Sequence, residues 1–196
     1  MFTGIIEATG TIEDTRKNGT NTTFIIKSTL SPELQPDQSL AHNGVCLTVE
    51  ACNESTYQVT AIDETLKKSN IGDLNKGNNI NLERSLTLQK RIDGHIVQGH
   101  VDAVSDCLNK KSEEGSYVFT FSLPEEWRNL LVEKGSIAVN GVSLTVFDVL
   151  QDRFSVAIIP YTYDHTNFNE LKEGSRVNLE FDIIGKYISK MAGNYV

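Results

Sequence analysis

The chain has little that would suit a membrane, a secretory route or nucleic acid. Its 196 residues contain no apolar run near the roughly 18 residues of a membrane-spanning helix, and Met1–Glu7 lacks the basic start and long apolar stretch of a signal peptide. Lysine and arginine total 18 against 26 aspartates and glutamates, so the net charge is −8. A surface this acidic disfavours nucleic acid and anionic membranes as partners.

Cysteine is scarce, and its spacing shows no pairing. Cys46, Cys52 and Cys107 are odd in number and form no CxxC motif. This pattern indicates reduced thiols in a cytoplasmic protein and not a disulfide framework. The histidines, cysteines and carboxylates form no cluster with metal-ligand spacing either, so we expect no metal site.

What the chain does contain is an internal repeat. Ser39–Val49 returns almost unchanged as Ser136–Val146, and between Ser39–Glu83 and Ser136–Glu180, 17 of 45 positions are identical. A repeat this long exceeds the roughly 20–50 residues of a solenoid unit, so it indicates a duplicated domain. Two copies of one fold offer two similar pockets, which points to chemistry on two similar molecules.

Each half is predicted to be all-β. Short runs of β-branched and aromatic residues end at glycine, asparagine, aspartate and serine, and Asn43-Gly44 and Asn140-Gly141 are strong tight-turn signals. So many short strands favour a small closed barrel in each half. The expected strands are Thr23–Lys27, Val45–Val49, Ile80–Leu82, Tyr117–Ser122, Val142–Phe147, Phe154–Ile159 and Arg176–Phe181.

Helices are expected to be few. Short ones fit Ser31–Leu34 and Pro124–Leu131, and the tail carries an apolar stripe at helical spacing, formed by Ile183, Ile184, Tyr187, Ile188 and Met191. That face would pack either on its own barrel or on another subunit. We predict domains at 1–90 and 91–182, separated by the charged link Arg84–Gly94, and a C-terminal helix at 183–196.

Five segments, in order and spanning nearly the whole chain, resemble riboflavin synthases: Met1–Glu7, Asn43–Val49, Gly94–Asp102, Lys134–Val146 and Ile159–Thr162. The resemblance implies two tandem six-stranded antiparallel β-barrels and a C-terminal amphipathic helix. It also implies a homotrimer whose active sites lie between the N-terminal barrel of one subunit and the C-terminal barrel of a neighbour.

The resemblance further implies a transferase of riboflavin biosynthesis. Two molecules of 6,7-dimethyl-8-ribityllumazine dismutate, and a four-carbon unit passes from one to the other. The products are riboflavin and 5-amino-6-ribitylaminouracil. The family uses no metal or redox cofactor, and some relatives dock inside a lumazine synthase capsid, which makes that protein a possible partner.

The substrate needs backbone amides at its ring edge and hydroxyls along its ribityl tail. On a strand, Cys46 and Thr48 point one way while Leu47 points to the core, and the same alternation applies to the second copy. The predicted substrate contacts are Gly4, Ile5, Ile6, Cys46, Leu47, Thr48, Thr60, Ala61, Ile62, Asp63, Glu64, Thr65, Gly99, His100, Val101, Lys134, Ser143, Leu144, Thr145, Ala157, Ile158, Ile159, Pro160, Tyr161 and Thr162.

The chemistry requires removal of a proton from the C7 methyl group and addition of a nucleophile to C7 of the partner molecule. We predict His100 as the proton shuttle because histidine titrates near neutrality. His95 lies five residues earlier, so on a strand it would face the opposite way. His42 is interpreted as a turn residue, and His165 as a surface or tail-contacting residue.

The remaining catalytic candidates are Cys46, Ser143, Thr145 and Lys134. Cys46 is a possible nucleophile or a small buried apolar residue, and Ser143 or water could serve in its place. Lys134 would stabilise negative charge on the deprotonated lumazine, or be a solvated surface residue. Some relatives carry aspartate where this chain has Asn140, which cannot take a proton and is expected to orient neighbours or form the turn.

Three further residues receive supporting roles. Ser39 and Asp182 are candidates for a shell around the site, and Phe2 is interpreted as an apolar lid or as part of a disordered tail. The alternative to an enzyme is a non-catalytic lumazine protein, but those relatives have eroded motifs in the second barrel. A flavin-dependent reductase is a third class, and it would need a glycine-rich βαβ segment that is absent here.

Overall fold

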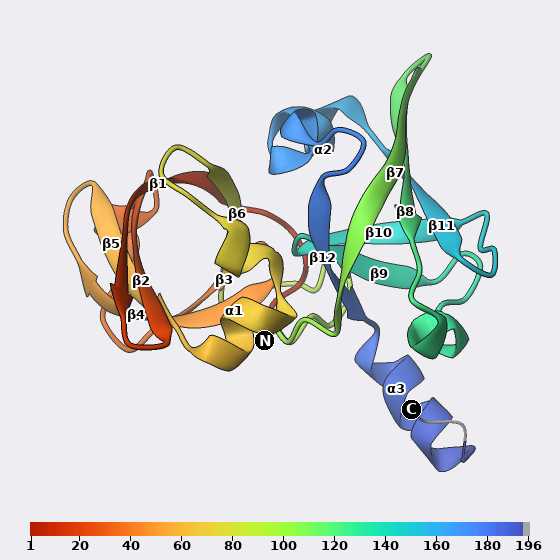
Figure 1. Cartoon of the computed structure of the whole chain (residues 1–196), viewed down its shortest axis with the longest axis horizontal. Helices are drawn as coiled ribbons and strands as arrows, with labels where there is room; N and C mark the ends of the chain where they lie inside the picture. The colour runs from red at the N-terminus through yellow and green to blue at the C-terminus, as the bar shows by residue number, and fades with distance from the viewer. Residues whose placement is uncertain (194–196) are drawn as a thin grey trace.

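A computed structural model describes residues 1–193. Six antiparallel strands form the first barrel, which closes in the order β1-β2-β5-β4-β3-β6 (Figure 1). Between strands lie one short α-helix, α1, and two 3-10 turns, η1 and η2. The bounds are β1 Ala8–Asn18, β2 Asn21–Ser28, η1 Ser31–Glu33, β3 Ser39–His42, β4 Val45–Cys52, β5 Thr56–Ala61, α1 Asp63–Lys68, η2 Asn70–Asp73 and β6 Asn79–Arg84.

The second barrel repeats this plan and closes in the order β10-β11-β8-β7-β12-β9. The predicted fold class is therefore confirmed, while the predicted domain boundaries stay predictions. Its elements are β7 Ala103–Glu113, β8 Ser116–Ser122, η3 Glu125–Leu130, β9 Ser136–Val139, β10 Val142–Phe147, β11 Arg153–Ile158, α2 Pro160–Asp164, η4 Asn167–Glu170 and β12 Arg176–Phe181.

Strand alternation builds each core. In β4, Val45, Leu47 and Val49 are buried while Cys46 and Thr48 are not, as their spacing predicts. The two cores differ in aromatic content: the first contains Phe24 and Tyr57, whereas the second contains five phenylalanines, of which Phe119 and Phe168 meet edge to face at 5.3 Å. Each barrel thus carries its own apolar centre and leaves alternate residues of β4 and β10 outside it.

The barrels exchange their leading segments. Phe2 pairs with Val97 in an antiparallel bridge between the barrels. From there Ile6 packs against the core of the second barrel, while Val101 packs against the core of the first. The residues before each barrel therefore lie along the other one.

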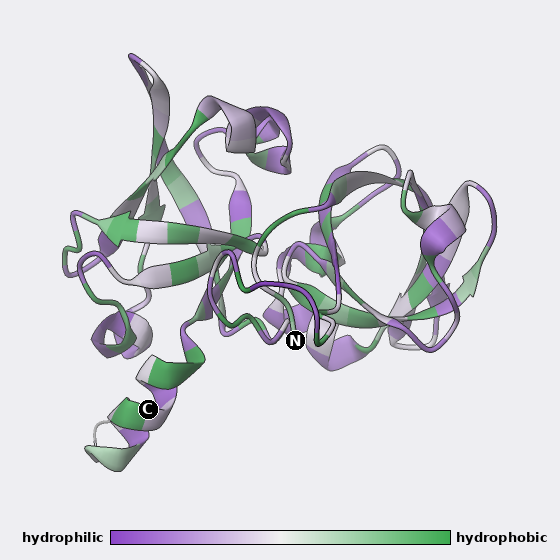
Figure 2. Cartoon of the chain, turned by 180° about the vertical axis from the view of Figure 1, so that it is seen from behind, coloured by the Kyte–Doolittle hydropathy of each residue, from purple (hydrophilic) through white to green (hydrophobic). Residues whose placement is uncertain are grey.

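The C-terminal helix α3, Ile183–Met191, extends away from both barrels, and its apolar residues are prominent in Figure 2. Ile184, Tyr187 and Ile188 are each more than half exposed, so packing on the chain's own barrel does not cover them. Residues 194–196 of the predicted helix lie outside the described residues. No helix within residues 1–193 has the length and apolar character to span a membrane.

Candidate active site

A cavity of about 280 Å³ opens beside strand β4 of the first barrel. It collects residues that are far apart in the sequence, and most of them are predicted substrate contacts. Its lining consists of Val45, Cys46, Glu64, Thr65, Lys68, Ser69, Gly99, His100 and Val101. The fold therefore brings the candidate nucleophile Cys46 and the candidate proton shuttle His100 to one pocket.

The backbone of Gly99 forms the wall of this cavity next to Cys46. The Cys46 N–H donates to the Gly99 carbonyl at 2.9 Å, and a Cβ on Gly99 would lie 2.6 Å from the Cys46 Cβ. The φ angle of Gly99 is +83°, so this position needs glycine twice over, for its conformation and for its contact. The side chain of His100, the next residue, is exposed.

The second barrel has an equivalent arrangement around Ser143 on β10. The Ser143 N–H donates to the Gly4 carbonyl at 2.8 Å, and a Cβ on Gly4 would lie 2.5 Å from the Ser143 Cβ. The φ angle of Gly4 is +76°. Ile5 follows Gly4 as His100 follows Gly99, and it is also exposed.

Ser143 has a partner that the sequence did not reveal. His95 is buried, and its Nδ1 lies 2.7 Å from the Ser143 Oγ in a hydrogen bond. Burial lowers the pKa of His95, and the nearby charge of Asp182 opposes this only in part. A neutral imidazole is thus held against a hydroxyl, an arrangement that can accept a proton from Ser143.

The segment that carries both histidines is not the strand considered above. Residues from Gly94 to Asp102 form no regular strand, and only Val97 makes a bridge. His95 is nevertheless buried near Ser143, while His100 is exposed at the Cys46 cavity. The two histidines therefore belong to different barrels' sites. Within residues 1–193, no three histidine, cysteine or carboxylate side chains are grouped to hold a metal ion.

Comparison with known proteins decides the family. The lumazine binding domain matches this chain twice, over residues 3–85 and 98–182. The riboflavin synthase of Bacillus subtilis (strain 168) is 40% identical over 189 residues, covering 96% of this chain and 88% of that protein. The chain belongs to the riboflavin synthase family. The enzyme of Mycobacterium tuberculosis (strain H37Rv) is 37% identical over 97% of this chain and 98% of its own length.

Solved structures agree on the fold. LumP complexed with riboflavin superposes with a TM-score of 0.86 at 23% identity, covering 92% of this chain and 99% of that one. LumP complexed with 6,7-dimethyl-8-(1'-D-ribityl) lumazine gives 0.83 at 24% identity, covering 92% and 98%. The two matches to the lumazine binding domain and the superposition on these structures both agree with two tandem barrels.

The two short helices α1 and α2 carry different side chains at equivalent positions of the repeat. On α1, Glu64 and Lys68 form an ion pair at 2.8 Å and line the Cys46 cavity. On α2, at the equivalent positions, the rings of Tyr161 and His165 stack with centroids 4.1 Å apart. His165 is exposed, in line with its predicted place at the surface.

Other predicted contacts divide by strand alternation. Thr48 and Thr145 are exposed beside Cys46 and Ser143, and Lys134 lies over the ring of Phe147 on that same side of β10, with its Nζ 5.7 Å from the ring centroid. The side chains that point to the cores, or pack against them, are Leu47, Ala61, Leu144 and Ile158. Their ligand contacts stay predictions, as do those of the exposed Ile62, Ala157, Ile159 and Pro160.

Several remaining candidates have local partners. The Thr60 hydroxyl is hydrogen-bonded to that of Thr23 at 2.8 Å, and Asp63 pairs with Lys67 at 2.6 Å. Thr162 is half-buried, and its carbonyl accepts from the Thr166 hydroxyl at 2.7 Å. The expected supporting residue Ser39 pairs with Thr48 across β3 and β4, and Asp182 caps α3 by accepting from the Ile184 N–H at 2.9 Å.

Two interpretations were wrong. His42 is not a turn residue: it is fully buried on β3, where its ring nitrogens lie 2.9 Å from the Leu40 carbonyl and 3.0 Å from the Tyr57 hydroxyl. Burial lowers its pKa to about 4. Phe2 is neither a lid nor part of a disordered tail, because it is 1% exposed and packs between the barrels. Both depend on contacts between residues distant in the sequence.

Six asparagines form a hydrogen-bonded group between the barrels, called here the asparagine seam. The sequence did not predict that they act together. Asn43, Asn70, Asn81 and their repeats Asn140, Asn167 and Asn178 bond across the junction. The Asn81 Nδ2 donates to the Asn140 carbonyl at 3.0 Å, and the Asn178 Nδ2 donates to that of Asn43 at 2.9 Å. The only sequence signal was that all three pairs are identical in the repeat.

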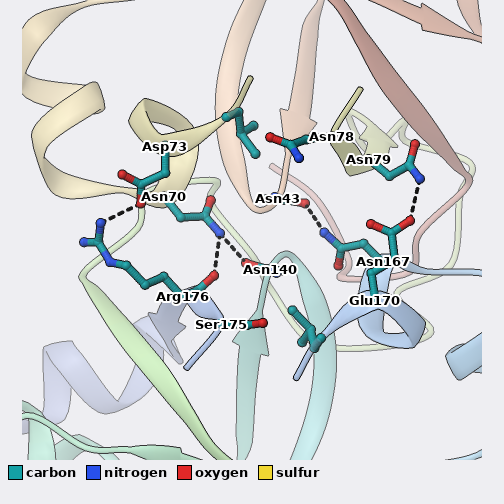
Figure 3. Close-up of a pocket in the computed structure, with 12 residues that line it drawn as sticks. Asn43, Asn70, Asp73, Asn78, Asn79, Asn140, Asn167, Glu170, Ser175 and Arg176 are labelled. Atoms are coloured by element: carbon teal, nitrogen blue, oxygen red, sulfur yellow. Dashed lines mark hydrogen bonds and ion pairs between the residues drawn. The ribbon is translucent and has the colours of Figure 1, made fainter. Parts of the chain in front are cut away.

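Figure 3 shows four of these asparagines among the residues that line a cavity of about 400 Å³ between the barrels. Ion and hydrogen-bond pairs form its rims: Arg176 with Asp73, and Asn79 with Glu170. It contains none of the predicted site residues except Asn140, which was expected to orient neighbours or form a turn. Asn140 does both here: its φ is +45°, and its Oδ1 accepts from Asn178 and Asn70.

Proposed function

We propose that this chain catalyses the riboflavin synthase reaction, in which two molecules of 6,7-dimethyl-8-ribityllumazine dismutate to riboflavin and 5-amino-6-ribitylaminouracil. One observation carries the proposal. The duplicated barrels expose equivalent positions on β4 and β10, yet they present Cys46 with His100 at one and Ser143 with His95 at the other. Two similar scaffolds with different reactive groups suit one substrate used in two roles.

In the first barrel, His100 is proposed to move the proton at the C7 methyl group of the bound lumazine. It is exposed at a cavity whose walls include backbone of Gly99 and polar side chains of Glu64 and Thr65. A histidine with solvent access can exchange its proton between turnovers, as a shuttle requires. Cys46, half-buried in the same cavity, is the nucleophile candidate on this side.

In the second barrel, Ser143 is proposed to add to C7 of the other lumazine. The buried imidazole of His95 would take the Ser143 proton across their 2.7 Å hydrogen bond. Thr145 lies on the same side of β10, and Lys134 is available beyond it to offset negative charge on the ring. Holding two reactants in register can supply roughly 7–11 kcal/mol of the barrier reduction.

The proposal includes a homotrimer with active sites between the first barrel of one subunit and the second barrel of the next. Its support is the apolar face of α3, formed by Ile184, Tyr187, Ile188 and Met191, which this chain leaves exposed. The same proposal includes lumazine synthase as a further partner. It also includes a cytoplasmic location for the protein, which the three free cysteines favour.

The test is a single reaction mixture of purified protein, 6,7-dimethyl-8-ribityllumazine and a chelator. We expect riboflavin to form at half the rate of lumazine loss. Tight lumazine binding without riboflavin formation would instead favour the alternative function, a non-catalytic lumazine protein. The similarity to the LumP structures is the reason to test for it. No binding at all would contradict both functions.

A further inference from the structure

Two buried glutamates, at equivalent positions of the repeat, each bind a cluster of hydrogen-bond donors. Glu180 on β12 is 3% exposed and accepts from the backbone N–H groups of Gln98, Gly99 and His100 at 2.6, 2.9 and 2.9 Å. Glu83 on β6 is 1% exposed and accepts from the N–H and hydroxyl of Thr3, each at 2.7 Å, and from the Gly4 N–H at 2.9 Å.

The segments that these carboxylates hold do not serve their own barrels. Gly99, held by Glu180 of the second barrel, receives the Cys46 N–H of the first barrel. Gly4, held by Glu83 of the first barrel, receives the Ser143 N–H of the second. The exchange of leading segments therefore places each glutamate behind the candidate site of the opposite barrel.

We propose that Glu180 and Glu83 are positioning residues that work crosswise: Glu180 sets His100 at the Cys46 pocket of the first barrel, and Glu83 sets Gly4 and Ile5 at Ser143 in the second. The assignment of these pockets as substrate sites rests on the proposed function. The crosswise support itself rests only on the hydrogen bonds and the fold.

A carboxylate suits this task because all of its lone pairs accept. Burial raises the pKa of Glu180 and that of Glu83, while the donated N–H groups work in the opposite direction. In an isosteric glutamine, an NH2 group replaces one of the two carboxylate oxygens. The two N–H bonds of that group would point toward groups that are themselves donors. At least one buried N–H would then lose its partner, and the segment would loosen.

The experiment compares Glu180→Gln with Glu83→Gln by iodoacetamide alkylation of Cys46, followed by mass spectrometry of the peptide that contains it. We expect Glu180→Gln to raise the Cys46 rate about tenfold, the order expected for one lost buried hydrogen bond. Glu83→Gln should leave this rate within about twofold, although it removes the same kind of carboxylate. The alkylation rate of the buried Cys107 reports any global unfolding in either variant.

The second arm reads the other barrel through the imidazole NMR signals of His95, whose backbone N–H donates to the Thr3 carbonyl at 3.1 Å. Glu83→Gln should shift these signals, and Glu180→Gln should not. If a glutamine variant fails to fold, Glu180→Asp and Glu83→Asp retain the charge and are compared in the same way. Equal effects of both variants on Cys46, or effects confined to the glutamate's own barrel, would overturn the proposal.

Neither arm depends on turnover, so a failure of the positioning proposal can be distinguished from a failure of the proposed function. If alkylation and NMR follow the crosswise pattern but no riboflavin forms, the positioning stands and the enzymatic assignment is lost. Where riboflavin does form, Glu180→Gln should lower kcat more than it raises KM, because His100 is displaced while most binding contacts remain.

Discussion

The first and second barrels share a backbone plan but differ in several side chains at their candidate sites. Cys46 is replaced by Ser143, and the histidine after the wall glycine, His100, is replaced by Ile5. The ion pair on α1 gives way to stacked rings on α2. Both barrels retain the glycine that contacts Cys46 or Ser143 (Gly99 and Gly4), the buried glutamate (Glu83 and Glu180) and the asparagines that bond across the junction.

This difference separates two kinds of constraint. The retained residues hold backbone: Gly4 and Gly99 have positive φ, and the glutamates and asparagines satisfy buried N–H and carbonyl groups. Loss of a glutamate or an asparagine would leave buried polar groups unpaired, and a side chain at either glycine would clash with the opposite barrel. The changed residues, among them Cys46 and Ser143, lie at the candidate sites, where they make the two barrels chemically different.

The largest expected effect comes from giving the first pocket the residue of the second. His100→Ile should lower kcat by roughly 10²–10⁴-fold, the usual contribution of a general acid–base group. Lumazine affinity should change by less than about threefold, because the wall backbone is untouched. Single-turnover rates and fluorescence titration separate the two. Parallel losses in rate and affinity would make His100 a binding residue.

A second change tests the acid sensitivity of the first barrel. The pKa of His42 is about 4 in the folded state, below the ordinary 6.5, so the unfolded chain binds the extra proton between these values. Stability should therefore fall by about 3 kcal/mol as pH drops from 6.5 to 4. The second barrel has Val139 at the position of His42, so this histidine has no counterpart in the repeat.

The matched variant for this prediction comes from the repeat itself, where Val139 and Phe154 occupy the positions of His42 and Tyr57. His42→Val alone leaves the Tyr57 hydroxyl unpaired and should cost about 1–3 kcal/mol. His42→Val with Tyr57→Phe should remove that cost and the part of the acid slope that His42 contributes, measured by urea unfolding at pH 7 and 5, while the part from the buried His95 remains. An unchanged slope in the double variant would contradict the assignment.

The third prediction concerns the histidine that only the second pocket has. His95→Gln should slow turnover about tenfold by removing the proton acceptor of Ser143, with little change in lumazine affinity. In the parent, burial lowers the pKa of His95, so its acceptor form is lost only as pH falls below the ordinary value of 6.5. A pH profile of kcat that is identical in parent and variant would exclude this role.

The smallest effect is expected on α2. Tyr161→Glu with His165→Lys copies the exposed ion pair of α1 onto α2, and protein stability should change by less than about 1 kcal/mol because both pairs are exposed. If the rings also face a ligand, affinity for the weaker of two lumazine sites should fall about fivefold. Calorimetric titration measures the affinity of each site. An unchanged affinity would mean that the rings of Tyr161 and His165 do not contact the ligand.

Much of the fold was predictable because it is encoded locally and stated twice. The Asn43-Gly44 turn, the alternation around Leu47 and the repeat of whole strands each depend on near neighbours in the chain. The grouping of Cys46 with His100 was also expected, though through family resemblance and not through spacing. Periodicity could not have found it, because the segment around His100 is irregular.

The site partners that were missed share one physical cause. His95 meets Ser143 across 48 residues, and Asn178 meets Asn43 across 135. No local propensity reports such contacts, since a buried polar group takes whichever partner the fold brings to it. His42 was misjudged for the same reason, because its partner Tyr57 lies on a different strand.

The sequence by itself determined the two barrels, their turns, the strand faces and the family, because these follow from local pattern and from repetition. Tertiary structure alone decided that the leading segments cross over, so that the residues before one barrel complete the other. That outcome depends on strands of each barrel donating backbone hydrogen bonds to the carbonyls of Gly4 and Gly99, and on Glu83 and Glu180, which accept from the N–H groups of those glycines. Such bonds form only once both barrels are closed and adjacent.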